Sequence, residues 1–225
     1  MSFKILDGSM GSELIRRELN PSLYTWSADA NITSPDMVEK IHREHVAAGA
    51  DYITTNTFRT TPRAYNKTSA INPKASARTS LYKAVDLAKK SARKSVKVLG
   101  SIAPLEDCYL PNLFPGRVTA IAEFTKLGKW LKDADVDILL LETMNSAAET
   151  EAALIATQDF NLPIWLGFVL KDGFRLLSGD SMIDTLNMVK NYPVDTVLLN
   201  CNPLDRTLIA AENLVTNWSN KWGVY

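Results

Sequence analysis

The sequence has few of the features that mark secreted, membrane or nucleic-acid-binding proteins. It contains only two cysteines, Cys108 and Cys201, too few for a secreted disulfide framework, so we expect reduced thiols. The 25 basic and 25 acidic residues give a net charge of +0, so no overall field attracts nucleic acid or an anionic membrane. No apolar run approaches the roughly 20 residues that span a bilayer, and the N-terminus does not resemble a secretory signal. We therefore expect a cytoplasmic protein that binds neither nucleic acid nor membranes.

The rest of the composition is that of an ordinary globular protein. Hydrophobic residues make up 46% and charged residues 22% of the 225 residues. A chain of this length removes roughly 70% of its unfolded surface from water, which is enough for a substantial core. Because no linker or low-complexity tract interrupts it, we expect a single domain over residues 1–225.

Short apolar runs alternate with longer stretches of helical period, which is typical of repeated βα units and a parallel sheet. The run Ile138–Leu141 is apolar on both strand faces, as a central parallel strand must be. Ser34 is expected to cap a helix that starts at Pro35 and ends near Gly49. The expected strands are Lys4–Asp7, Tyr52–Asn56, Val96–Ile102, Ile138–Thr143, Ile164–Leu170 and Thr196–Cys201, and the expected helices are Pro35–Ala48, Pro73–Lys94, Val118–Ala134, Ser146–Gln158, Met182–Asn191 and Leu204–Trp218.

Polar residues gather where these strands end, at residues 7–8, 54–57, 101, 142–143 and 200–201. Such strand ends form the active-site rim of a (β/α)8 barrel, although a doubly wound open sheet also binds ligands there. The turn at residues 7–12 is not the glycine-rich phosphate turn that an open sheet would favour. We therefore predict an α/β fold of the (β/α)8 TIM-barrel type.

The number of repeats is smaller than a closed barrel needs. Six βα units are visible, and Trp222–Tyr225 resembles the start of a seventh strand, whereas a complete barrel takes about 250 residues. An open barrel would leave two unpaired sheet edges, which natural proteins avoid. We therefore expect a barrel that is truncated after about the sixth unit. Two alternatives are that a second copy in a homo-oligomer completes it, or that the sequence is a fragment of a longer protein.

Several strand-end motifs, read together, identify a family. They are Leu6–Leu14, Trp26–Ala28, Ile41-His42, Ala48–Phe58, Gly100–Pro104, Leu141–Thr143 and Leu199–Cys201. In this order and spacing the chain resembles, over its whole length, the homocysteine S-methyltransferase family. That family includes betaine- and S-methylmethionine-using enzymes and the homocysteine module of cobalamin-dependent methionine synthase. The resemblance implies methyl transfer from a small-molecule donor to the thiol of L-homocysteine, giving methionine.

The resemblance also implies a zinc ion held by three cysteine thiolates. Zinc deprotonates a coordinating thiol, and the thiolate is the nucleophile. Cys201 matches the first zinc cysteine, at the end of the sixth barrel strand. The other two belong to a Gly-Gly-Cys-Cys motif that this sequence does not contain, and Cys108 follows the third strand and matches neither. The zinc site is therefore expected to be incomplete in this chain; without that match Cys201 would be an ordinary buried cysteine.

The remaining site residues follow from the same resemblance. Asp7 and Gly8 match the turn that binds the substrate amino group, although Asp-Gly also favours an ordinary turn. Thr57 matches a threonine that helps to hold homocysteine. Glu142 matches the carboxylate that binds the ammonium group, its alternative being a capping or ion-paired glutamate; it and Asp7 are the candidate catalytic residues.

Three further assignments are less specific. Asn200, beside the zinc cysteine, is a candidate substrate-binding residue. Trp26 matches an aromatic near the methyl-donor pocket of some members, where it could attract a cation, or else it packs in a loop. His42 and His45 share one helix, and we expect surface or boundary positions rather than a metal site. The segment 105–111 departs from the better-known members, which leaves the donor open.

Two functions follow from this pattern. The first is homocysteine S-methyltransferase activity, with homocysteine and a methyl donor as small-molecule partners. The alternative is a truncated or catalytically inactive homologue that binds an amino acid or a partner protein. The missing cysteine pair motivates the alternative, because one thiolate cannot build a tetrahedral zinc site.

Overall fold

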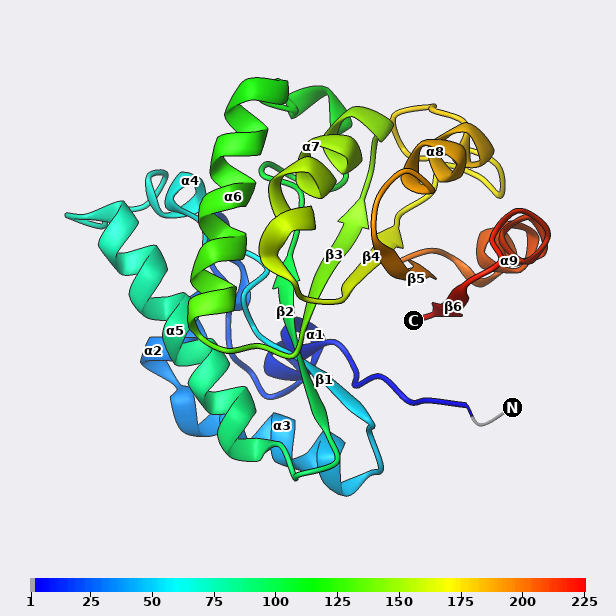
Figure 1. Ribbon diagram of the computed structural model, residues 1–225. Helices are drawn as coiled ribbons and strands as arrows, with labels where there is room; N and C mark the ends of the chain where they lie inside the picture. The colour runs from blue at the N-terminus through cyan, green and yellow to red at the C-terminus, as the bar shows by residue number, and fades with distance from the viewer. Residues whose placement is uncertain (1–2) are drawn as a thin grey trace. The chain divides into compact units, whose positions relative to one another are not determined.

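The computed structural model of the protein describes residues 3–225, and this part of the chain divides into two compact units (Figure 1). Within the described residues, the N-terminal unit comprises residues 3–101 and Trp130–Ile138, and the C-terminal unit comprises Ile102–Lys129 and Leu139–Tyr225. Each unit contains parallel strands connected by helices. The expectation of a single domain stays a prediction.

The N-terminal unit combines a short parallel pair of strands with several helices. Strand β1 (Tyr52–Thr54) pairs in parallel with β2 (Lys97–Ile102). The helices are α1 (Met10–Arg16), α2 (Ala30–Thr33), α3 (Pro35–Ala47), α4 (Pro62–Tyr65) and α5 (Pro73–Ser91). Helix α3 packs along α5.

Two apolar clusters form the core of this unit. One joins α1, α2, α3 and α5 and consists of Met10, Leu14, Ala30, Val38, Ile41 and Leu87. The other fills the space between the strands and the helices and consists of Val46, Ala50, Ile53, Ala88 and Val98. Because the two clusters draw on residues far apart in the chain, they fix the helices against the strand pair.

The C-terminal unit carries a longer run of parallel strands. Strands β3 (Ile138–Met144), β4 (Ile164–Phe168), β5 (Val194–Leu199) and β6 (Lys221–Val224) pair in that order. The helices α6 (Arg117–Asp133), α7 (Ala147–Thr157), α8 (Met182–Val189) and α9 (Leu204–Asn217) accompany them, and α8 lies beside both α7 and α9 (Figure 1). Leu139, Leu140 and Leu141 are fully buried, which confirms the expected central strand.

All six expected helices are present, with ends within three residues of the predicted ones. The short helices α1, α2 and α4 were not predicted, because four to seven residues are too few to show a helical period. The predicted strand Lys4–Asp7 is reduced to one parallel bridge between Leu6 and Tyr52. Beside this bridge, Asp51 Oδ2 accepts the backbone N–H of Ile5 at 2.9 Å.

The ends of α3 confirm two predictions and contradict one. Pro35 occupies the first turn, and Gly49 beyond the helix has a φ of +104°, a conformation that glycine adopts without strain. The Ser34 hydroxyl makes no capping hydrogen bond, so the predicted cap is wrong. Among residues 3–225, no helix is both long and apolar enough to span a bilayer.

His42 lies inside the protein rather than at its surface or boundary, so that prediction is wrong for this residue, whereas His45 is partly buried. His42 follows Val38 and precedes Val46 at four-residue spacing, which places all three on the buried face of α3. The side chain is 0% exposed, and neither ring nitrogen has a hydrogen-bond partner. Burial lowers its pKa from 6.5 to about 3, so the imidazole is neutral at pH 7.

Replacing His42 by leucine should make the stability of the protein less sensitive to acid. Unfolding exposes an imidazole that binds a proton below its ordinary pKa of 6.5, whereas the folded pKa is about 3. The stability that depends on neutral His42 is therefore complete above pH 6.5 and is lost as the pH falls towards 3. Urea unfolding between pH 7.5 and pH 5 should show a slope shallower by about 1 kcal/mol per pH unit in His42→Leu. Equal slopes in the two proteins would contradict this account.

Candidate functional site

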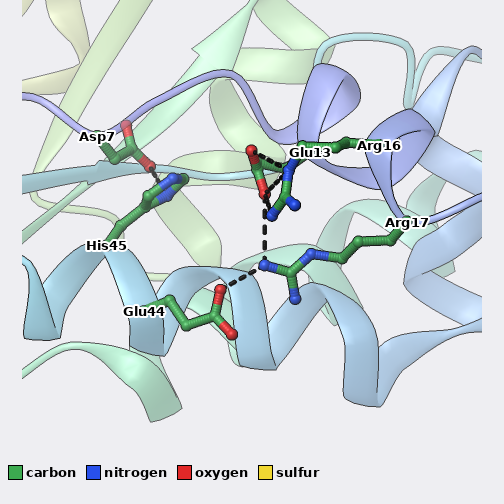
Figure 2. Close-up of polar contacts among 6 residues, drawn as sticks. All are labelled: Asp7, Glu13, Arg16, Arg17, Glu44 and His45. Atoms are coloured by element: carbon green, nitrogen blue, oxygen red, sulfur yellow. Dashed lines mark hydrogen bonds and ion pairs between the residues drawn. The ribbon is translucent and has the colours of Figure 1, made fainter.

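In the N-terminal unit, Asp7 is fixed at the end of the first extended segment. Its Oδ2 accepts the backbone N–H of Thr54 at 2.8 Å, and its own N–H donates to Tyr52 O at 3.0 Å. The side chain is only 4% exposed, and His45 Nδ1 lies 3.9 Å from Oδ2 (Figure 2). One carboxylate oxygen of Asp7 therefore accepts a backbone hydrogen bond from β1.

Gly8 lies against the ring of His45. A Cβ at Gly8 would be 3.2 Å from His45 Nε2, so a larger residue would press on that ring. Burial lowers the pKa of His45, while the carboxylates of Glu13 and Glu44 act in the opposite direction and Arg17 adds to the lowering. These three charged groups lie on α1, on the residue that ends it and on α3.

An ion cluster joins α1 to α3 beside Asp7 (Figure 2). Glu13 pairs with Arg16 at 2.7 Å and with Arg17 at 3.3 Å, and Arg17 also binds Glu44. The hydrogen bond from Arg16 is the main cause that lowers the pKa of Glu13 to about 2. Because Arg17 bridges the two helices, the cluster fixes α1, which directly follows the Asp7-Gly8 turn.

Thr57 lies just beyond β1 and is buried. Its hydroxyl donates to Ser101 O at 2.7 Å and lies 2.8 Å from Thr55 Oγ1. Thr55 Oγ1 in turn accepts the backbone N–H of Ser101 at 3.1 Å. These bonds join the ends of β1 and β2, and contact between Thr57 and a substrate stays a prediction.

A buried amide network near Thr57 was not predicted as a functional feature. Asn56 Nδ2 donates to Ser27 O and Asn31 Oδ1 at 2.8 and 2.9 Å, and Ser27 Oγ donates to Asn56 Oδ1 at 2.6 Å. Asn31 Nδ2 also binds Asn56 O and Ser80 Oγ, each at 3.0 Å. The network attaches the segment around Trp26 to the end of β1. Ser27 and Asn56 both lie in strand-end motifs, which was the only signal in the sequence.

Trp26 has an unusual backbone and a partly open side chain. Its φ is 51°, in the left-handed region that favours glycine, and the residue is 43% exposed. Its N–H and C=O both bond to Ser22, at 3.0 and 3.1 Å. The indole passes directly over Gly11, where a Cβ would be 2.4 Å from Trp26 Nε1. Trp26 therefore has a strained backbone and is partly exposed, and contact between its ring and a cation stays a prediction.

In the C-terminal unit, Glu142 and Cys201 occupy strand ends on either side of β4. Glu142 is partly buried near the end of β3, and its Oε2 accepts a hydrogen bond from Tyr225 OH at 3.1 Å. Cys201 lies two residues beyond the end of β5 and has a φ of 55°. Asn200 between them is fully buried, and its Nδ2 donates to Cys201 Sγ at 3.5 Å.

The two thiols are both free, as predicted. Burial raises the pKa of Cys201, and the carboxylate of Glu142 raises it further. Tyr109 is close to this thiol as well, and its own pKa is raised to about 12, first by burial and then by Cys201 and Cys108. The surroundings that this chain provides therefore hold the pKa of the Cys201 thiol above its ordinary value.

The described residues do not fit the zinc site of the expected type. Among residues 3–225, no group of three or more His, Cys, Asp or Glu side chains could hold a metal ion. Cys201 is the one matching thiol, whereas Cys108 is buried in the loop after β2, where its carbonyl accepts a hydrogen bond from Asn145 Nδ2 at 3.0 Å. A tetrahedral thiolate site cannot be assembled from these groups.

Comparison with known proteins identifies the family. Residues 4–225 match the homocysteine S-methyltransferase family. The chain belongs to this family. It is 28% identical to homocysteine S-methyltransferase of Escherichia coli, covering 93% of this chain and 73% of that protein. For homocysteine S-methyltransferase 2 of Zea mays the identity is 27%, and the match covers 88% of this chain and 66% of the maize protein.

The fold agrees with that of a solved family member. The metallated form of the homocysteine methyltransferase MmuM from Escherichia coli superposes with a TM-score of 0.91 and 26% identity, over 100% of this chain and 83% of that one. The predicted barrel-type α/β fold is thereby confirmed, with six parallel strands in this chain. The predicted family is confirmed too, whereas the roles of the individual site residues stay predictions.

The contact between Gly11 and Trp26 predicts an unusual effect of alanine in a helix. Gly11→Ala should lower the free energy of unfolding by about 1–3 kcal/mol, because the new Cβ displaces the indole. In a Trp26→Ala background the same change should instead stabilise the protein, by up to about 1 kcal/mol, through helix propensity. Urea unfolding of the four proteins measures both effects. An equal effect of Gly11→Ala in the two backgrounds would show that the indole does not need this glycine.

Proposed function

We propose that this protein takes part in methyl transfer to the thiol of L-homocysteine, and that Glu142 binds the ammonium group of that substrate. The observation that carries the proposal is that Glu142, near the end of β3, and Cys201, beyond the end of β5, lie on the two strands that flank β4 in the C-terminal unit. The carboxylate is close enough to the thiol to raise its pKa. Homocysteine has an ammonium group at one end and a thiol at the other, so one small molecule can reach both positions.

The hydrogen bond from Tyr225 to Glu142 supports this role. It orients the carboxylate at 3.1 Å without neutralising it, because a tyrosine hydroxyl carries no charge at pH 7. A partly buried, oriented carboxylate binds an ammonium group more strongly than an exposed one does. In the N-terminal unit, Asp7 and Thr57 are proposed to contact the same class of substrate, and the open face of Trp26 to attract a sulfonium or quaternary-ammonium donor.

A second function is favoured by the composition of the thiol site. The described residues offer one thiol that matches the zinc site, whereas the resemblance to the family implies three cysteine thiolates around the metal. Residues 1–225 alone would then bind the amino acid without transferring the methyl group. Amino-acid binding is common to both functions, whereas methyl transfer requires further metal ligands.

Replacing Glu142 by glutamine should weaken homocysteine binding while the fold is preserved. Glutamine has nearly the same shape and can still accept the hydrogen bond from Tyr225, but it carries no charge. Loss of a charged hydrogen bond corresponds to an increase of Kd by about 10- to 100-fold in isothermal titration calorimetry. Glu212→Gln, an exposed site on α9, is the matched control and should leave Kd unchanged. Equal affinity of Glu142→Gln and the unmodified protein would contradict the assignment.

Metal content separates the two functions. After dialysis, the 225-residue chain should contain well under one zinc per chain, because one thiol cannot hold the ion tightly. The second function then predicts that this chain by itself binds homocysteine but does not methylate it when a sulfonium or quaternary-ammonium donor is supplied, and that methyl transfer requires further metal ligands. Elemental analysis of size-fractionated protein provides the measurement, with Cys201→Ser as the control. One zinc per chain that is lost in Cys201→Ser would instead favour a catalytic site completed by ligands from another copy.

A further inference from the structure

The side chain of Asn200 bridges two strand ends of the C-terminal unit. Its Oδ1 accepts the backbone N–H of Thr143 at 3.1 Å, and its Nδ2 donates to Thr143 Oγ1 at 2.9 Å and to Cys201 Sγ at 3.5 Å. The residue is 0% exposed. Both ends of the amide are therefore used within the protein, on the end of β3 and on the turn after β5.

The two residues that Asn200 binds have backbones that L-amino acids rarely adopt. Thr143 has a φ of 59° and Cys201 a φ of 55°. Left-handed conformations are unfavourable for residues with a Cβ, so they persist only where surrounding contacts enforce them. Asn200 accepts from the backbone N–H of Thr143 and donates to its hydroxyl, so it engages the backbone and the side chain of the strained residue together.

The same position interrupts the pairing of β3 with β4. The register shifts between Leu141 and Met144, which leaves Glu142 and Thr143 at an irregularity of the strand. Irregularities of this kind redirect the side chains beside them and are frequent next to active sites. The direction of the Glu142 carboxylate thus depends on the conformation of Thr143.

Strand β4 leaves room for the Asn200 side chain, because its residue 167 is a glycine. A Cβ at Gly167 would lie 2.7 Å from Asn200 Oδ1, which is closer than real Cβ atoms approach. Gly167 has no left-handed φ that would require glycine, so the requirement at this position is steric. The backbone N–H of Asn200 donates to Phe168 O, the next residue on β4, at 3.1 Å.

We infer that Asn200 is a positioning residue that sets the Glu142 carboxylate and the Cys201 thiol in place without touching the substrate. The inference rests on the proposed function in that Glu142 is taken to bind the substrate ammonium. The sequence suggested that Asn200 contacts the substrate directly. We infer instead that it acts through Glu142 and Cys201. Thr143 and Gly167 take part in the same arrangement. The Thr143 hydroxyl accepts a hydrogen bond from the Asn200 amide, and Gly167, which has no side chain, leaves space for that amide.

The test uses the full 225-residue chain and two readouts. The first is the Kd for L-homocysteine, and the second is the rate of alkylation of Cys201 by iodoacetamide at fixed pH, measured by peptide mass spectrometry. Asn200→Ala should raise Kd by about tenfold or more, because the carboxylate is no longer held in its binding direction. It should also raise the alkylation rate of Cys201 several-fold, because the thiol loses its hydrogen bond from Asn200 and its turn is released.

Cys108 serves as a reference within the same molecule. It is buried, so its alkylation reports general loosening of the unit. A positioning role predicts a change at Cys201 with an unchanged rate at Cys108, whereas a purely structural role would raise both rates together and would overturn the inference. Thr143→Val is the matched variant: it removes the hydroxyl that accepts from Asn200 and also hydrogen-bonds Cys201, but it keeps the bond from the Thr143 N–H to Asn200 Oδ1, so its effect should have the same direction.

Two further variants keep the test decisive. Asn200→Asp retains an acceptor for the Thr143 N–H and should fold if Asn200→Ala does not, with an intermediate Kd. Gly167→Ala pushes on the amide from β4 and should shift both readouts in the same direction as Asn200→Ala. Folded variants with Kd and Cys201 rates within about twofold of the unmodified protein would overturn the inference. If the unmodified protein fails to bind homocysteine, the proposed function fails, and the alkylation rates alone decide the positioning role.

Discussion

The structure depends on how parallel strands satisfy the backbone groups at their ends. Where a neighbouring strand does not supply the partner, a side chain accepts the hydrogen bond instead, and an unsatisfied group would be costly. At the amino-terminal ends, Asp51 accepts the N–H of Ile5 and Asp137 accepts that of Val98. At the carboxyl ends, Asp7 and Asn200 do the same for Thr54 and Thr143.

This constraint explains why the candidate site residues serve two purposes. Asp7, Thr57 and Asn200 each complete a strand end within their own unit. The carboxyl ends of parallel strands are also where this type of fold binds its ligands. A substitution at any of the three is therefore expected to affect both local structure and binding, which is why matched control variants are necessary to separate the two effects.

Much of the fold could be predicted, because each long helix and each buried strand has its own hydrophobic period. The helix Pro35–Ala47 and the strand Ile138–Met144 are examples whose ends the sequence indicates closely. Short elements such as α1 and α2 could not be predicted, since they are stabilised by contacts with distant residues. Arg17 holds α1 to Glu44, and Asn31 in α2 binds Asn56 and Ser80. His42 was misplaced for a similar reason, because polarity favours the surface and only packing shows that its helix face is buried.

The sequence alone determined the family, the α/β class and the candidates Glu142 and Cys201, because these depend on residue types in a fixed order along the chain. Only the tertiary structure showed that Thr143 and Cys201 are left-handed and that Asn200 joins them across 57 residues of sequence. It also showed that Trp26 covers Gly11. Backbone conformation and close approach between distant segments leave no periodic signal in a sequence, since they arise from packing and hydrogen bonds that form only when the chain has folded.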